Sequence, residues 1–130
     1  MKICITSTDS NLNAQVDPRF GRCAYLLIVD SDTMQFEAIP NLAAGSSGGA
    51  GIQAAQTIAN MGAKVLITGN VGPNAFRALS AAGIVIMTDA SGTITEAIEK
   101  FKTGKLKNTD APTVGEHASA KSQERGIWRI

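Results

Sequence analysis

Short apolar runs separated by polar or glycine-containing turns dominate the first 107 residues of the chain. Five of these runs predict β-strands, because each is short, apolar and bounded by turn residues: 2–6, 24–30, 33–39, 64–68 and 84–88. Only Ser31 and Asp32 separate the second run from the third, and such a short connection predicts an antiparallel hairpin.

Three segments in the second half predict helices: 52–60, 74–82 and about 93–102. Gly62 and Gly83 follow the first two, and Pro73 suits the first turn of the second. Helices that alternate with apolar strands are typical of parallel strands covered on both faces. We therefore predict one three-layer α/β/α domain over residues 1–107, with a five-stranded mixed sheet and three helices.

Residues 108–130 show neither a helical nor a strand period, and they are polar. This stretch holds His117 and Trp128, each the only residue of its type in the chain. We expect a polar C-terminal tail that is flexible unless contact with the domain or with a partner orders it.

The composition of the chain argues against nucleic-acid-binding, disulfide-rich and membrane-spanning proteins. The 130 residues carry a net charge of +1, and aromatic residues make up 5%. A chain this close to neutral does not hold nucleic acid by bulk charge, and so few aromatic rings do not make a base-stacking surface. Two cysteines are too few for a disulfide scaffold, and no run of about 18 apolar residues predicts a membrane span. We expect a cytoplasmic protein with no membrane or nucleic-acid partner.

Four loops are expected to meet beyond the carboxyl ends of the strands, where ligands bind in open α/β sheets. They cover 7–23, 45–51, 69–73 and 88–92. Three lead into helix N-termini, whose free N–H groups favour an anion. The pattern of a nucleotide-binding P-loop is absent after Gly51, and the dinucleotide fingerprint has the wrong spacing. The alternative is that these glycines only make tight turns.

Cys23 is the candidate metal ligand. Arg19 and Arg22 lie close to it in the sequence, and a nearby cation lowers the pKa of a thiol and favours the thiolate. The alternative is a small buried residue at the start of a strand. Cys4, inside the first apolar run, is interpreted as a core residue. A nuclease would need carboxylates that converge on metal ions, for which the chain offers Asp9, Asp17 and Asp89.

Three motifs carry a family resemblance: VDPRFGRC at 16–23, GGAGIQAA at 48–55 and ITGNVGPNAF at 67–76. In this order they resemble the signatures of the dinitrogenase iron–molybdenum cofactor biosynthesis family, the NifX type that also forms the C-terminal part of NifB-like proteins. The resemblance covers roughly residues 1–107. It implies a ribonuclease-H-like fold without a nuclease site.

The resemblance also implies a non-catalytic protein that binds or carries an iron–sulfur or iron–molybdenum cofactor, or a precursor of one. Its partners would be cofactor donor and acceptor proteins, and it would be a monomer or a weak homodimer. With Cys23 as metal ligand, the implied cofactor-binding residues are Arg19, Phe20, Gly21, Arg22, Gly48, Gly49, Gly51 and Asn70.

One position departs from the family pattern. Family members associated with nitrogenase tend to carry His, implicated in cofactor binding, where this chain has Arg19. Guanidinium has no free lone pair and stays protonated, so Arg19 is expected to pair with an anionic cluster rather than ligate it. A different class of function stays open: a regulatory or protein-interaction module that binds phosphate, nucleotide or an acidic partner at the same turns.

Overall fold

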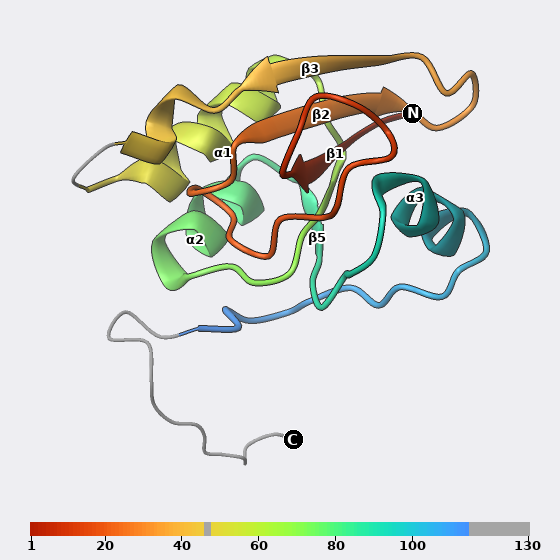
Figure 1. The fold of residues 1–130 in the computed structure, drawn as a ribbon. Coiled ribbons are helices and arrows are strands. Elements are labelled where there is room, and N and C mark those ends of the chain that lie inside the picture. Colours follow the sequence, from red (N-terminus) through yellow and green to blue (C-terminus); the bar gives the residue numbers. More distant parts are fainter. Residues whose placement is uncertain (46–47, 115–130) are drawn as a thin grey trace.

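The computed structural model of the chain describes residues 1–45 and 48–114 (Figure 1). Its elements follow the expected order, and they are β1 (Lys2–Ser7), β2 (Tyr25–Asp30), β3 (Phe36–Pro40), the 3-10 helix η1 (Leu42–Gly45), α1 (Ala50–Asn60), β4 (Val65–Ile67), α2 (Pro73–Ala81), β5 (Val85–Met87) and α3 (Ile94–Lys102). The predicted five strands and three α-helices are confirmed in this part of the chain.

The strands form one mixed sheet in the order β3-β2-β1-β4-β5. β2 runs antiparallel to β1 and β3, whereas β1, β4 and β5 are parallel. The register places Ile3 beside Val65 and Ile5 beside Ile67. This arrangement agrees with the ribonuclease-H-like architecture that the family resemblance implies.

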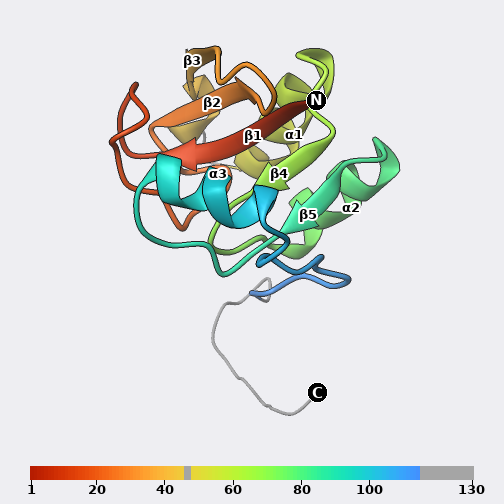
Figure 2. The same cartoon turned by 90° about the vertical axis from the view of Figure 1, so that its right-hand side faces the viewer.

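Helices cover both faces of the sheet, so the predicted three layers are confirmed. Figure 2 shows α3 in front of the strands and α1 and α2 behind them. Side chains alternate along β1 accordingly: Ile3 and Ile5 pack with Ile98 of α3, whereas Cys4 packs on the opposite face with Ile58 of α1 and with α2.

The connection between β2 and β3 is longer than predicted. The predicted antiparallel hairpin is confirmed, but five residues, 31–35, separate the two strands instead of the two expected. The carboxylate of Asp30 accepts hydrogen bonds from the N–H groups of Asp32 (2.8 Å) and Thr33 (3.2 Å). Met34 adopts a φ of 65° and donates its N–H to Asp30 O at 2.8 Å. The side chain of Asp30 therefore builds a wider turn and delays the third strand to Phe36.

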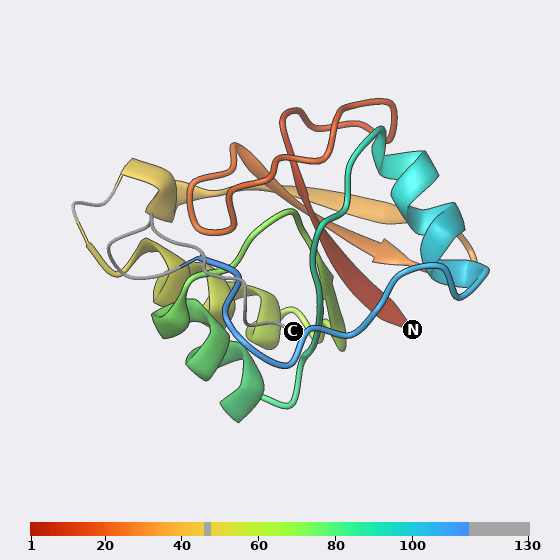
Figure 3. The ribbon, with the colours of Figure 1, turned by 90° about the horizontal axis from the view of Figure 1, so that it is seen from below.

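Residues 108–114 of the expected tail lie against the domain. They extend from the α3 side of the molecule toward α2 (Figure 3). Thr109 donates its N–H to Ile86 O at 2.7 Å, next to the bridge between Asn108 and Met87. The rest of the tail prediction, with His117 and Trp128, lies outside the described residues. Within the described ranges no helix is long and apolar enough to cross a membrane.

Candidate functional site

Asp17 and Arg19 form a fork-to-fork ion pair in the loop between β1 and β2. Arg19 donates from Nε to Asp17 Oδ1 and from Nη2 to Asp17 Oδ2, each at 3.2 Å. Asp17 Oδ1 also accepts the backbone N–H of Arg19 at 3.0 Å, so the carboxylate closes a tight turn around Pro18. Thr6 Oγ1 donates to the Asp17 carbonyl at 2.6 Å and ties this turn to the end of β1. The ion pair is thus anchored to the carboxyl end of the central strand β1.

The two partners differ in exposure. The Asp17 side chain is 4% exposed, whereas that of Arg19 is 66% exposed. Two of the five guanidinium N–H groups bond to Asp17, and the other three have no partner among the described residues. The hydrogen bonds that Arg19 donates to Asp17, and then the negative charge of Asp17, raise the pKa of Arg19, which stays protonated. Arg19 therefore presents a fixed set of donors to solvent rather than a large net charge.

The turn after β4 supports the Arg19 loop from one side. Asn70 donates its N–H to Pro18 O at 2.8 Å and accepts the N–H of Phe20 at 3.4 Å. A Cβ on Gly69 would lie 2.6 Å from Pro18 Cα, a distance that real Cβ atoms essentially never show. Gly69 thus lets the two loops touch, and the Asn70 side chain remains exposed beside Arg19.

The start of α1 supports the same loop from another side. Gly21 has a φ of 95°, and a Cβ there would lie 2.9 Å from Gly51 N. Gly51 in turn lies so close to α2 that its Cβ would be 2.8 Å from Ala75 Cβ. Both glycines are therefore required for packing. The three sequence motifs meet through these backbone contacts.

Gly48 and Gly49 are exposed, and a Cβ at either would contact nothing within 4 Å. Gly49 is the N-cap of α1, with a φ of 73° and no side chain capping the helix. The first N–H groups of α1 consequently need partners from outside the helix. Of the predicted glycines, these two lie at an open surface, whereas Gly21 and Gly51 are packed.

Cys23 lies in the core. Its side chain is fully buried with Cys4 beneath α1 and α2. Asn41 donates from Nδ2 to Cys23 Sγ at 3.7 Å and to Cys23 O at 3.0 Å. Burial, followed by the charge of Asp17, raises the pKa of the Cys23 thiol to about 12. The expected lowering of this pKa by the arginines is therefore wrong, and the alternative of a small buried residue describes the structure.

Phe20 and Arg22 point to different surroundings. Phe20 is buried in the same core cluster as Cys23. Arg22 donates from Nη1 to Ala44 O at 2.8 Å and so holds the end of η1. Among the predicted cofactor-binding residues, Arg19, Asn70, Gly48 and Gly49 are the ones that face solvent without such an anchoring role.

The described part of the chain contains no group of three or more His, Cys, Asp or Glu side chains that could hold a metal ion. Asp9 and Asp89 do not join Asp17 in such a group, and Asp17 is already paired with Arg19. The carboxylates thus give no support to a two-metal nuclease within these ranges.

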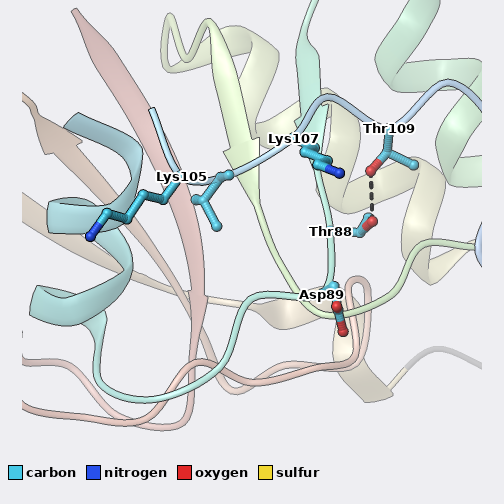
Figure 4. Close-up of a pocket in the computed structure, with 6 residues that line it drawn as sticks. Thr88, Asp89, Lys105, Lys107 and Thr109 are labelled. Atoms are coloured by element: carbon cyan, nitrogen blue, oxygen red, sulfur yellow. Dashed lines mark hydrogen bonds between the residues drawn. The ribbon is translucent and has the colours of Figure 1, made fainter. Parts of the chain in front are cut away.

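A cavity of about 360 Å³ lies beyond β5 (Figure 4). It is bordered by Thr88 and Asp89 on one side and by Lys105, Leu106, Lys107 and Thr109 on the other. The hydroxyls of Thr88 and Thr109 bond to each other at 2.6 Å, and Lys105 directs its ammonium away from them. Asp89, a candidate carboxylate of the nuclease alternative, lines this cavity, whereas none of the predicted cofactor-binding residues does.

Sequence reasoning missed two contributors to the site. Asp17 was considered only as a candidate metal ligand, although the DPR order places its carboxylate within reach of an arginine two residues later. Asn41, which binds Cys23, lies 18 residues away in the chain. No local pattern could have indicated Asn41.

Comparison with known proteins gives a family and a set of relatives. The family model described as dinitrogenase iron-molybdenum cofactor matches residues 1–104. An uncharacterized protein of Methanocaldococcus jannaschii is 35% identical over 98 residues, which cover 73% of this chain and 83% of that protein.

Two solved structures share both sequence and fold. The apo form of the orange protein from Desulfovibrio gigas is 45% identical with a TM-score of 0.83, covering 85% of this chain and 94% of its own. A Thermotoga protein provisionally named NifB is 34% identical with a TM-score of 0.73, covering 82% of this chain and 91% of its own. The five-stranded sheet and its helices are thus common to these proteins.

Proposed function

The chain belongs to the dinitrogenase iron–molybdenum cofactor family, and from this membership we propose that it binds and carries an iron–sulfur or iron–molybdenum-type cofactor, or a precursor of one, without catalysing a reaction. Proteins that make the cofactor and proteins that receive it would be its partners. The name of the family and the existence of an apo form of the orange protein support a role in handling a bound group.

One observation carries the proposal: the exposed guanidinium of Arg19, held in place by the buried carboxylate of Asp17. Metal–sulfur complexes with sulfide ligands are commonly anions, and hydrogen bonds to their sulfur atoms tune their properties. Arg19 offers three unpaired N–H groups within the described structure. A guanidinium that is already fixed loses little freedom when it binds an anion.

The described residues fit such a group by hydrogen bonding and charge rather than by coordination. They contain no set of three metal ligands, and the Cys23 thiol is buried and protonated. Arg19, the exposed Asn70 amide and the open backbone at Gly48 and Gly49 would hold the anion from outside. Cys23, in this account, packs the loop that carries Arg19.

The hypothesis that Cys23 ligates metal requires the loop to open and the thiol to lose its proton. Anaerobic loading with ferrous iron and sulfide tests it, followed by desalting, visible absorption and metal counting. We expect Cys23→Ala to take up as much metal as Cys4→Ala, its matched control in the same core. Loss of uptake in Cys23→Ala alone would assign the thiolate as a ligand and contradict our account of the site.

The alternative function is a module that binds phosphate, nucleotide or an acidic partner, since the same donors suit any anion. Calorimetric titration with phosphate and nucleotides, next to tetrathiomolybdate as a small molybdenum–sulfur dianion, separates the two. We expect heat and a change in visible absorption with tetrathiomolybdate. Binding of phosphate or nucleotide, with none of tetrathiomolybdate and no uptake of iron and sulfide, would overturn the cofactor proposal.

A further inference from the structure

Residues 105–114, here named the C-terminal strap, lie beyond the part of the chain that the family model matches. The strap leaves the end of α3 and passes the end of β5 (Figure 3). Asn108 bridges Met87, and Thr109 donates its N–H to Ile86 O at 2.7 Å. These contacts fix the middle of the strap to the edge strand of the sheet.

The far end of the strap binds Val71, in the turn between β4 and α2. Val71 donates its N–H to Thr113 Oγ1 at 2.8 Å, and Val71 O accepts the N–H of Thr113 at 2.9 Å. Val71 is 1% exposed. A buried N–H without a partner is costly, and within the described structure only the Thr113 hydroxyl satisfies this one. Thr113 therefore binds both backbone groups of Val71, its N–H and its carbonyl.

Val71 follows Asn70, which supports the Arg19 loop. Asn70 binds Pro18 O through its N–H at 2.8 Å and the Phe20 N–H through its carbonyl at 3.4 Å. These two contacts lie on either side of Arg19 in the sequence. A continuous series of backbone contacts thus leads from Thr113 to the residue that carries the proposed function.

We propose that Thr113 is a positioning residue for the cofactor site, because it holds Val71 and, through Asn70, the loop that presents Arg19. The strap thereby makes the geometry of the site depend on a segment outside the part matched by the family model. This inference rests on the proposed function where it concerns ligand affinity. Its effect on the Arg19 loop can be measured without any ligand.

Three variants of the full chain test this role. Thr113→Val keeps the shape of the side chain and removes the hydroxyl that Val71 needs. Thr113→Ser keeps the hydroxyl and serves as the rescue. Thr109→Val is the matched control, because it removes a hydroxyl from the same strap whose partner, Thr88, lies outside the Arg19 site.

Amide hydrogen exchange by NMR gives the local readout, and the affinity for tetrathiomolybdate gives the functional one. In Thr113→Val we expect exchange at Val71, Asn70 and Phe20 to be about tenfold faster, and binding to be several-fold weaker. The central strand amide of Ile5 serves as the reference, since a global loss of stability would accelerate its exchange too. Thr113→Ser and Thr109→Val should resemble the wild type at all these amides.

Unchanged protection at Asn70 and Phe20 in Thr113→Val would overturn the inference. Lost protection with wild-type affinity would overturn it as well, because Thr113 would then hold the loop without positioning the site. If the wild type itself binds no tetrathiomolybdate and takes up no iron and sulfide, the proposed function fails. Amide exchange then decides on its own whether Thr113 holds the loop.

Discussion

The carboxylate of Asp17 is 4% exposed and holds the 66% exposed guanidinium of Arg19 through two hydrogen bonds of 3.2 Å each. A buried anion thus fixes an exposed cation at the edge of the sheet. Such a pair contributes little to stability on its exposed side, where water screens the charge. Its main effect is geometric, because the remaining guanidinium N–H groups face outward in one orientation.

Asp17→Asn should release Arg19. The amide keeps one oxygen for the turn but places N–H donors against the guanidinium, so one or both of the side-chain hydrogen bonds are lost. We expect the midpoint of thermal unfolding to fall by a few degrees and tetrathiomolybdate to bind about tenfold more weakly. Asp89→Asn is the matched control, because the exposed Asp89 carboxylate has no hydrogen bond or ion pair within the described residues. Equal binding by both variants would contradict the role given to Asp17.

Gly69→Ala should disturb the contact between the two site loops. Its Cβ would lie 2.6 Å from the backbone of Pro18, which has no flexible side chain to move away. We expect a loss of about 1–3 kcal/mol in the free energy of unfolding. Gly48→Ala should change it by less than about 0.5 kcal/mol, because a Cβ there meets nothing within 4 Å. Urea denaturation measures both, and a Gly69→Ala variant as stable as Gly48→Ala would refute the close approach.

Cys23 should make stability depend on pH in the alkaline range. Its pKa is about 12 in the folded protein, against an ordinary value of 9.0. The folded state therefore holds the proton more tightly, so the contribution is complete below pH 9 and is lost as pH rises toward 12. The loss amounts to at most about 1.4 kcal/mol per pH unit.

Cys23→Ser removes this titration and keeps a group that can accept a hydrogen bond from Asn41. Urea denaturation at several values between pH 8 and pH 10.5 (an accessible range below the raised pKa) should show a steeper fall for the wild type than for Cys23→Ser. Alkylation of the native wild type by iodoacetamide should also be slow at neutral pH. If the free energy of unfolding fell equally with pH in the wild type and in Cys23→Ser, and if alkylation were rapid, the thiol would be accessible and its pKa would not be raised by burial.

Thr93 should be a stabilising residue at the start of α3. Its hydroxyl accepts the N–H of Glu96 at 3.1 Å, and the Glu96 carboxylate accepts the N–H of Thr93 at 2.8 Å. Thr93→Ala should lower the free energy of unfolding by about 1 kcal/mol. Thr93→Ser keeps the hydroxyl and should retain most of this stabilisation. Chemical denaturation compares the two, and equal losses in both variants would exclude the capping hydroxyl as the cause.

The fold follows from local patterns that the chain repeats. Short apolar runs alternate with helices that end at glycine, and the TITE sequence at 93–96 forms a capping box. The parallel β3-α1-β4 and β4-α2-β5 connections place α1 and α2 on one face, and α3, which follows the last strand, covers the other. The β2–β3 turn differs because one carboxylate, Asp30, binds two backbone N–H groups and widens it.

The site was harder to predict, because its important contacts are long-range or depend on side-chain direction. Cys23 lies near two arginines in sequence, yet its side chain points into the core. The contact between Thr113 and Val71 joins residues 42 positions apart. Thr113 also lies in a stretch whose sequence shows neither a helical nor a strand period. The position of the loops after the strands correctly predicted that they meet, whereas burial decided which of their residues can reach a ligand.

The most direct test of the central claim is the affinity for tetrathiomolybdate of the wild type, Arg19→Lys and Arg77→Lys. Lysine keeps the positive charge and the pairing with Asp17 but lacks the planar set of donors. Arg77, an exposed arginine on α2, is the matched control. Our account predicts a Kd at least about tenfold higher for Arg19→Lys and unchanged for Arg77→Lys. Equal affinity in all three proteins would contradict it, because the anion would then bind without the fixed guanidinium of Arg19.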